Sequence, residues 1–272
     1  MSKLGIPVLT YHSQNICGSS HAQNDHVALQ HDLRVLYRHR YIPAPLDWLA
    51  DWLEGKRDDA DLEHRVILTF DDGCDFDVRD IDYPGHGLQR SFQGILNDFQ
   101  TWLPEPPPAL HATSFVIASR EAREIIDHGS LFGRGWMSDD WWRKTDMAGL
   151  IAIENHGWDH NHPDLAGEHR GCFDTVDTHE QCLQQVVRAA SAIERLTGRW
   201  PRYFAYPFGQ SSDYIRRQFF EKLPEIHGCR AALGTDAGLV TRLSDRWNLP
   251  RLVCGRDWRS AEELLNLIGI RY

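Results

Sequence analysis

The chain has 272 residues, of which 42% are hydrophobic, 25% charged and 11% aromatic. This composition is typical of a folded globular protein and excludes a disordered or collagen-like chain. The formal net charge of −10 opposes broad contact with a phosphate backbone or an anionic membrane, so we expect no nucleic-acid partner. No apolar run approaches the roughly 20 residues that span a bilayer, so we expect no membrane span.

The amino terminus and the cysteines give indications of the cellular compartment of the protein. The opening MSKLGIPVLTYHS lacks the apolar stretch of a secretory leader. The six cysteines show no CxxC pairing, which speaks against a zinc ribbon or a redox motif. We therefore expect a cytoplasmic protein with reduced thiols, although a mature chain without its leader would have the same pattern.

Short β-rich runs alternate with longer amphipathic runs along the chain, which predicts βα units around a parallel sheet. Strands are predicted at residues 6–11, 65–70, 112–118, 150–155, 203–206, 229–234 and 247–254. Helices are predicted at residues 27–40, 46–54, 88–103, 138–148, 176–197, 213–222 and 261–267.

Local signals support two of the helix ends and the connections between elements. Gly198 follows the helix at 176–197 as a C′ residue would, and Ser260 begins a capping-box spacing with Glu263. Long connections are expected at residues 74–87 and 163–174, and a proline-rich connector at residues 104–108. We expect residues 1–272 to form a single α/β barrel domain.

The sharpest local motif is VILTFDDGCD, in which a β-branched run ends at Asp71, Asp72 and Gly73. Two adjacent ionised carboxylates repel each other, and a cation between them relieves the repulsion. One Asp is then a ligand, while the other stays ionised and takes a proton from a water that the metal activates. Gly73 allows a tight turn. The alternative is a solvated turn, since Asp-Gly is common turn chemistry.

The second motif is ENHGWDHNHPDL, in which His156 and His160 are four residues apart. On a helical turn this spacing puts both rings on one face, close enough to chelate one ion. With 15 histidines in the chain, about 0.8 such pairs arise by chance, so the spacing alone is a weak signal. A loop conformation would allow His156 and His162, in place of His156 and His160, to be the chelating pair.

Taken together, the two motifs indicate a metal site more strongly than either motif alone. Asp72 follows the second predicted strand and His156 the fourth, and parallel strands of a barrel end at the same mouth. Two imidazoles and one carboxylate with open positions match a catalytic Zn²⁺ site. They also match a non-haem Fe(II) oxygenase site.

A third motif, YFAYPFGQ, breaks a strand at Pro207 and Gly209, with Phe208 between them. Backbone N–H groups freed at such a bend are able to bind a developing oxyanion. An ordinary turn is the alternative.

TFDDG, the HGWDH pair and the YPFG bend, in this order, resemble the NodB-homology polysaccharide deacetylases, carbohydrate esterase family four. The early YHS further resembles the bacterial branch with an amino-terminal YH motif. The resemblance implies a distorted (β/α)₇ TIM-like barrel. It also implies a metal-dependent hydrolase that removes an acetyl group from an N-acetylated amino sugar of a polysaccharide or glycan conjugate.

Carried over by position, the resemblance makes Asp71 the general base, Asp72, His156 and His160 the metal ligands, and the Phe208 amide an oxyanion donor. The expected ion is divalent, with Zn²⁺ favoured and Co²⁺, Ni²⁺ or Fe²⁺ as alternatives. The expected partner is an N-acetylated glycan or a related amide.

The chain departs from the family pattern at two places. The Arg that precedes the Pro of the third motif is replaced by Ala205 and Tyr206, and a late Leu-x-His motif that supplies the general acid is absent. Substitutes for the Arg are Arg202, Arg251 and Arg256, while His12 of YHS is a candidate acid or a buried structural histidine. These departures leave a catalytically weak glycan-binding barrel as an alternative. Trp158, between the two ligand histidines, is a candidate for stacking on a sugar.

Overall fold

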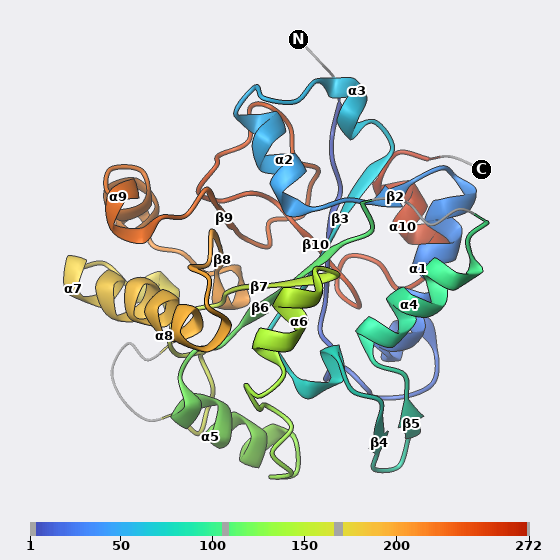
Figure 1. Cartoon of the computed structure of the whole chain (residues 1–272), viewed down its shortest axis with the longest axis horizontal. Helices are drawn as coiled ribbons and strands as arrows, with labels where there is room; N and C mark the ends of the chain where they lie inside the picture. Colours follow the sequence, from blue (N-terminus) through green and yellow to red (C-terminus); the bar gives the residue numbers. More distant parts are fainter. Residues whose placement is uncertain (1–3, 105–108, 166–170, 271–272) are drawn as a thin grey trace.

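A curled parallel sheet organises the molecule in the computed structural model, which describes residues 4–104, 109–165 and 171–270 (Figure 1). Along the sheet the strands run in the order β10-β1-β3-β6-β7-β8-β9, and β2 (Ile42–Pro43) pairs with β3 outside this path. The seven strands of the path are β1 (Val8–Tyr11), β3 (Arg65–Phe70), β6 (Ala112–Val116), β7 (Ile151–Asn155), β8 (Tyr203–Ala205), β9 (Ala231–Leu233) and β10 (Leu252–Val253). Each lies within one predicted run.

The two edges of the sheet approach each other, which gives the barrel its distorted form. β10 pairs with β1, and the residues just before it reach β9 through a parallel bridge between Leu233 and Leu249. The prediction of a distorted (β/α)₇ barrel is confirmed.

Alternate residues of the strands face different cores, as the two-residue period of a strand requires. Ile67 of β3 belongs to a cluster with Phe115 and with residues of α2, whereas Leu68 packs with residues of α1, α4 and α10. Because both faces are buried, such strands read as continuous apolar runs, and this explains why they were recognisable from sequence.

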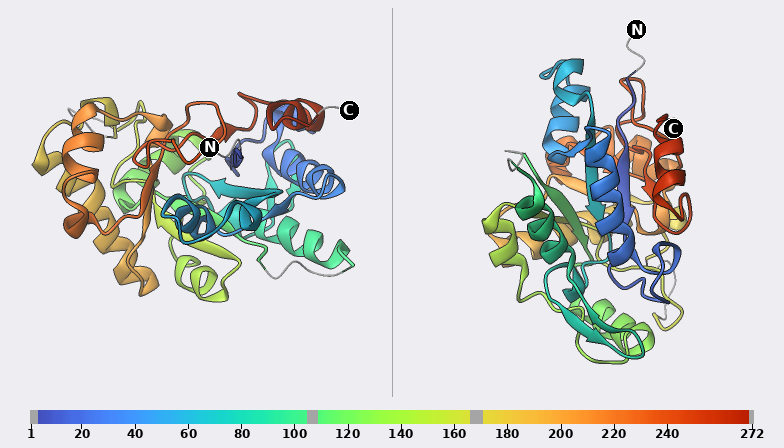
Figure 2. Two further views of the ribbon diagram at one scale, coloured as in Figure 1. Left: turned by 90° about the horizontal axis from the view of Figure 1, so that it is seen from above. Right: turned by 90° about the vertical axis from the view of Figure 1, so that its right-hand side faces the viewer.

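Helices surround the curled sheet (Figure 1). They are α1 (Asp25–Arg38), α2 (Leu46–Leu53), α3 (Asp59–Leu62), α4 (Phe92–Trp102), α5 (Arg120–Ser130), α6 (Trp142–Ala148), α7 (His179–Cys182), α8 (Arg188–Thr197), α9 (Pro224–His227) and α10 (Ala261–Leu267), with π-helical turns at η4 (Leu183–Val187) and η6 (Ile215–Phe220). Figure 2 shows α1, α4 and α10 at one end of the sheet and α7 to α9 at the other. No helix in the described part of the chain is long and apolar enough to cross a membrane.

Several predicted boundaries were wrong. The helix expected from residue 88 begins at Phe92, because Gly87–Gln89 (β5) pairs in an antiparallel hairpin with Ile81–Tyr83 (β4). Within the predicted run at 247–254, the strand itself spans only Leu252–Val253. The helix α5 was missed, although Ser119 caps it by accepting a hydrogen bond from the N–H of Ala122.

The predicted helix ends at Gly198 and Ser260 are confirmed. Gly198 has the left-handed φ of 88° expected at a C′ position, and the Ser260 hydroxyl accepts a hydrogen bond from the N–H of Glu263. The connector at 104–108 lies outside the described residues except for Pro104, and so do residues 166–170 of the connection at 163–174.

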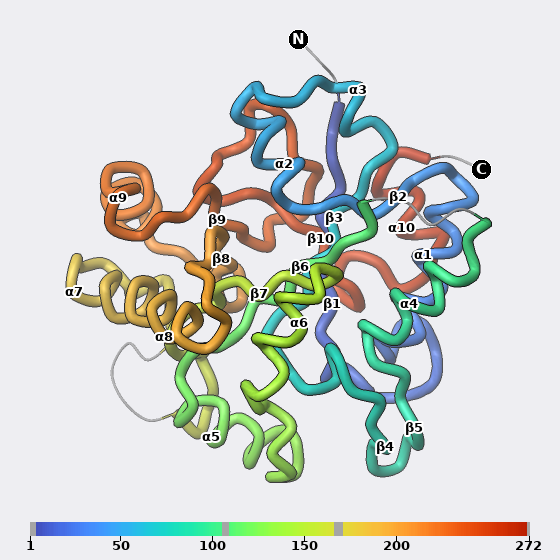
Figure 3. Tube along the Cα trace, in the orientation of Figure 1, coloured from blue at the N-terminus to red at the C-terminus, as the bar shows by residue number. Residues whose placement is uncertain are grey.

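The two ends of the parallel strands are covered differently. In the trace of Figure 3, α2 and α3 lie at the amino ends of the strands, while α5 and the β4–β5 hairpin flank the carboxyl ends. The connections that follow β3, β6 and β7 therefore meet at the carboxyl end.

Candidate metal centre

Asp71, Asp72 and Gly73 form a strained turn at the end of β3. Asp72 and Gly73 both adopt left-handed backbone conformations, with φ of 75° and 71°. A Cβ atom at position 73 would lie 2.6 Å from Cγ1 of Val116, so this position requires glycine. For Asp72 a positive φ is unfavourable, which is the kind of strain that concentrates at functional sites.

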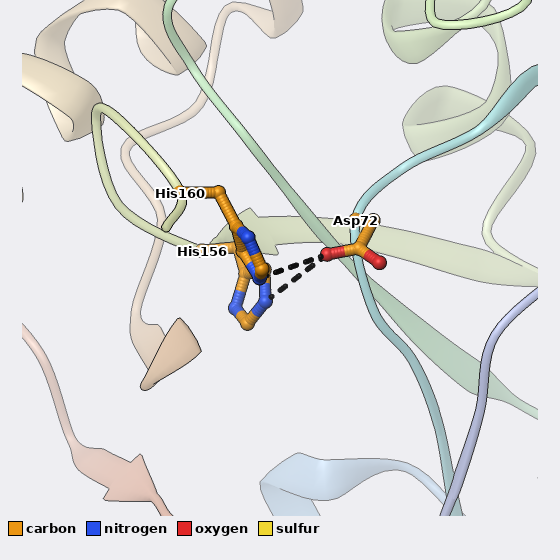
Figure 4. Close-up of side chains that lie close together, drawn as sticks. All are labelled: Asp72, His156 and His160. Carbon is orange, nitrogen blue, oxygen red and sulfur yellow. Dashed lines mark ion pairs between the residues drawn. The ribbon is translucent and has the colours of Figure 1, made fainter. Parts of the chain in front are cut away.

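The turn brings the Asp72 carboxylate to the two histidines that follow β7. Its Oδ1 atom lies 3.5 Å from Nε2 of His156 and 3.4 Å from Nε2 of His160 (Figure 4). These three side chains offer ligand atoms that all lie within 4.8 Å of one another. Oδ1 of Asp72 is buried and has no hydrogen-bond partner among the described residues. A buried carboxylate oxygen without a donor is unfavourable, and a cation between the three groups would satisfy it.

Both imidazole rings are oriented for metal binding by their other nitrogen. Nδ1 of His156 lies 2.8 Å from the carbonyl oxygen of Ala205, and Nδ1 of His160 lies 3.1 Å from that of Asn161. Because a carbonyl only accepts, each Nδ1 carries the hydrogen, and the lone pair of each Nε2 faces Asp72. The residues present therefore fit a divalent cation held by two nitrogen atoms and one oxygen atom, with Zn²⁺ as a suitable ion.

The third histidine of the motif, His162, has other partners. Its Nε2 lies 2.9 Å from Oγ of Ser130, and its Nδ1 accepts a hydrogen bond from the N–H of Asp164. Of the two pairs that the sequence left open, the structure brings His156 and His160 together at Asp72.

The pKa values of Asp72, His156 and His160 depend on one another. Burial by itself raises the pKa of Asp72, but the imidazoles of His160 and His156 hold it well below its usual range. For His156, burial lowers the pKa, but Asp71 and Asp72 outweigh burial and raise it. Burial prevails at His160, whose pKa is lowered. Asp72 therefore stays ionised, and His160 favours the neutral form that binds metals.

Asp71 is paired with a buried arginine. The Arg251 guanidinium donates two parallel hydrogen bonds of 2.8 Å to the two carboxylate oxygens of Asp71, and its side chain is fully buried. Burial raises the pKa of Asp71, but Arg251 and His156 hold it below its usual value. Of the three arginines named from sequence, Arg251 thus contacts the candidate base. Arg202 pairs with Asp47, and Arg256 with Asp257.

A cavity of about 480 Å³ opens over these groups. His12 lines it at the end of β1, where its backbone N–H donates to Oδ2 of Asp25 at 2.8 Å. Nδ1 of His12 is buried without a hydrogen-bond partner among the described residues. Gln14, which sequence reasoning missed, also lines the cavity and donates from Nε2 to Oδ2 of Asp72. No motif in the sequence marks this glutamine.

The bend at Pro207–Gly209 forms the rim of the cavity beside His160. Phe208 has a φ of 55°, and its exposed ring lies 4.7 Å from the His160 ring, centroid to centroid. A Cβ at Gly209 would lie 2.1 Å from Oγ1 of Thr235, so glycine is required there too. Sequence reasoning named Phe208 for its backbone N–H; the ring contact with His160 was not foreseen.

Trp158 lies on the other side of the histidine loop. It lines a second cavity of about 890 Å³ and is absent from the described lining of the first. The Arg188 guanidinium carbon lies 3.6 Å from the centre of the Trp158 ring. The position between two ligand histidines therefore does not place this tryptophan at the metal centre.

Comparison with known proteins gives this geometry a context. A family model described as "Polysaccharide deacetylase" matches residues 107–222, whereas no curated protein matches the chain by sequence.

Solved structures match over nearly the whole chain. A Streptococcus pyogenes deacetylase in complex with acetate has a TM-score of 0.67 at 16% identity, covering 98% of this chain and 99% of its own. IcaB from Ammonifex degensii has a TM-score of 0.63 at 18% identity, covering 97% of each chain. A polysaccharide deacetylase from Bacillus cereus has a TM-score of 0.62 at 15% identity, covering 97% of this chain and 69% of its own. At such identities the likeness concerns the fold. The family model and the shared fold together confirm the resemblance to the NodB-homology polysaccharide deacetylases.

Proposed function

We propose that the chain is a metal-dependent hydrolase that removes the acetyl group from an N-acetylated amino sugar of a polysaccharide or glycan conjugate. The observation that carries the proposal is the buried, unpartnered Oδ1 of Asp72, which faces Nε2 of His156 and His160 in the cavity that also holds Asp71. The family match and the shared fold support polysaccharide deacetylation as the reaction.

Asp72, His156 and His160 would hold the ion, with Zn²⁺ favoured and Co²⁺, Ni²⁺ or Fe²⁺ as alternatives. A divalent cation held there would polarise the acetamide carbonyl and lower the pKa of a water molecule.

Asp71 is suited to the role of general base. Arg251 keeps it ionised, so the carboxylate is ready to accept a proton at neutral pH, and the bidentate contact fixes its orientation. Arg251 thereby does what the missing motif arginine does in the family. The absence of that arginine no longer argues for a protein that only binds glycans.

The remaining steps fall to Phe208 and His12. The backbone N–H of Phe208 donates to the oxyanion that develops on the carbonyl oxygen, and His12 protonates the departing nitrogen. A C–O bond forms to the water oxygen and the C–N bond breaks, which yields acetate and a free amine. Cys254 also lines the cavity, but burial and Asp25 raise the pKa of its thiol far above neutrality, which makes the thiol a poor proton donor.

Release of acetate tests the proposal. Purified protein is incubated with chitin oligosaccharides, poly-N-acetylglucosamine and sugar-nucleotide conjugates. Each reaction is run with a chelator, without it, and after Zn²⁺ is restored. We expect acetate from at least one substrate, loss of the signal with chelator and recovery with Zn²⁺. Metal-loaded protein that binds a glycan without releasing acetate would support the non-catalytic alternative, and oxygen uptake would support the Fe(II) oxygenase.

A further inference from the structure

The loop that carries both candidate ligand histidines is held between two elements. On one side it extends the hydrogen bonding of β6. The N–H of His156 donates to the carbonyl of Val116 at 3.0 Å, and the N–H of Ser119 donates to the carbonyl of Trp158 at 2.9 Å. The first part of the loop is thus fixed by the strand next to β7.

On the other side the loop is held by the π-helical turn η4. The N–H of Trp158 donates to the carbonyl of Gln185 at 2.9 Å, and the N–H of Asp159 donates to the side-chain Oε1 of the same glutamine at 3.1 Å. At the next residue of η4, the side-chain amide of Asn155 donates to the carbonyl of Val186 at 2.9 Å. Two consecutive backbone N–H groups directly before His160 are therefore bound by a single residue.

The π-helical turn explains why Gln185 is able to do this. In η4 the hydrogen bonds run from residue i to residue i−5, as from the N–H of Arg188 to the carbonyl of Leu183. Where such a turn meets an α-helix, the change of spacing leaves a carbonyl without a donor in the helix, and π-turns of this kind are frequent at functional sites. In η4, Gln185 and Val186 turn carbonyls to the histidine loop.

We propose that Gln185 is a positioning residue for the metal centre, which acts by fixing the backbone that carries the His160 ring. Gln185 is only 5% exposed, so its amide is held in place. His156 has a distant anchor in the carbonyl of Ala205, whereas among the described residues the hydrogen-bond partner of Nδ1 of His160 is the carbonyl of its own neighbour Asn161. The direction of the His160 ring therefore depends on the path of the loop, and Gln185 sets this path at Asp159. The assignment of a metal-binding role rests on the proposed function, whereas the hold on the loop does not.

Three variants of the full chain test this inference. Gln185→Met keeps the length of the side chain and removes the oxygen that accepts from Asp159. Gln185→Glu restores an oxygen at the same place and serves as the rescue. Gln184→Met is the matched control, because Gln184 lies on the same turn and lines the second cavity, yet no hydrogen bond joins it to the loop in the described part of the chain.

Two measurements are made on each variant: Zn²⁺ affinity by competition with a chromophoric chelator, and amide hydrogen exchange in the metal-free protein. In Gln185→Met we expect metal affinity to fall about tenfold, as for other partners that orient a ligand. Exchange at the Asp159 N–H should accelerate, while the Trp158 N–H, which bonds to the main chain, keeps its protection. Steady-state kinetics should show a fall in kcat with KM little changed. Gln185→Glu and Gln184→Met should both stay near the wild-type values.

The inference would be overturned if Gln185→Met kept the wild-type metal affinity and the wild-type exchange protection of the Asp159 N–H. It would also be overturned if Gln184→Met lost as much metal affinity and protection as Gln185→Met. If Gln185→Met does not fold, Gln185→Asn withdraws the oxygen by one methylene and is compared with Gln185→Glu in the same way. A wild-type protein that binds no divalent ion would instead refute the proposed function. Exchange at Asp159 would still decide whether Gln185 holds the loop.

Discussion

Two buried carboxylates at different places in the barrel are surrounded by opposite kinds of partner. Beside the amino end of β8, Glu154 has donors on both oxygens. Oε1 accepts from Arg199 at 2.8 Å, and Oε2 accepts from the backbone N–H groups of Arg202 and Tyr203 at 2.6 and 2.9 Å. At the carboxyl end, Oδ1 of Asp72 faces two imidazole nitrogens and no donor among the described residues.

This difference distinguishes a structural charge cluster from a ligand site. A guanidinium and two backbone N–H groups satisfy both oxygens of Glu154 from within the chain, although burial still raises its pKa to about 7. The imidazoles around Asp72 present lone pairs, so the positive charge has to come from outside the chain. The two sites differ less in the number of charges than in whether the neighbouring groups donate hydrogen bonds to the carboxylate.

Asp72→Ala should have the largest effect, because it removes the only carboxylate in the ligand cluster that the structure describes. We expect loss of stoichiometric metal, measured by elemental analysis, and loss of detectable acetate release. Asp47→Asn, at the amino end, is the control and should keep both. Full metal content in Asp72→Ala would refute the assigned ligand set.

Asp71→Asn should separate chemistry from metal binding. The amide keeps the shape of the side chain but does not act as a base, so we expect the metal to remain while kcat falls by roughly 10²- to 10⁴-fold. Elemental analysis and acetate release on the same preparation check this. Turnover that survives the change would remove Asp71 as the base.

Arg251→Met should change the pH dependence of activity. Without its guanidinium, burial dominates at Asp71 and the pKa of that carboxyl rises. Since the base acts only when ionised, the acid limb of the kcat/KM profile should move to higher pH. Arg202→Met, which removes the exposed pair with Asp47 and the contact with the Tyr203 ring but no contact with Asp71, should leave the profile in place. If the acid limb of the kcat/KM profile does not shift in Arg251→Met, the contact between Arg251 and Asp71 does not set the pKa of the base.

Asp77→Asn should have the smallest effect on activity, because we expect it to change stability alone. Asp77 is fully buried and accepts a 2.6 Å hydrogen bond from Ser114, and its Oδ1 has no hydrogen-bond partner among the residues that the structure describes. Burial raises its pKa from 3.8 to about 7. Below pH 4 the folded and unfolded chains are both protonated at Asp77, so this group adds no pH dependence to the free energy of unfolding.

Between pH 4 and pH 7 the unfolded chain loses this proton first, so the wild type becomes less stable as the pH rises. The free energy of unfolding of Asp77→Asn, relative to wild type, should therefore increase over this window and level off above pH 7. Denaturant titrations with chelator present measure this difference, at about 1.4 kcal/mol for each pKa unit. A constant difference from pH 4 to pH 8 would contradict the raised pKa.

Much of the fold was predictable because its signals are local. The run at residues 65–70 matches β3 in both bounds, and the run at 261–267 matches α10. Buried parallel strands are continuous apolar runs, and caps such as Ser260 act within one turn. The predicted helix at 176–197 hid the π-turn η4, because the apolar pattern of i→i−4 and i→i−5 helices is nearly the same over one turn.

For the site, the sequence by itself determined the acidic pair after β3 and the candidate histidines after β7, because strand polarity brings such residues to one mouth. Only the tertiary structure decided between His160 and His162, selected Arg251 as the partner of Asp71, and revealed Gln14 and Gln185. Arg251 is 180 positions from Asp71 in the chain. Contacts of this kind depend on how strands are registered and loops are packed, and no local periodicity or spacing encodes them.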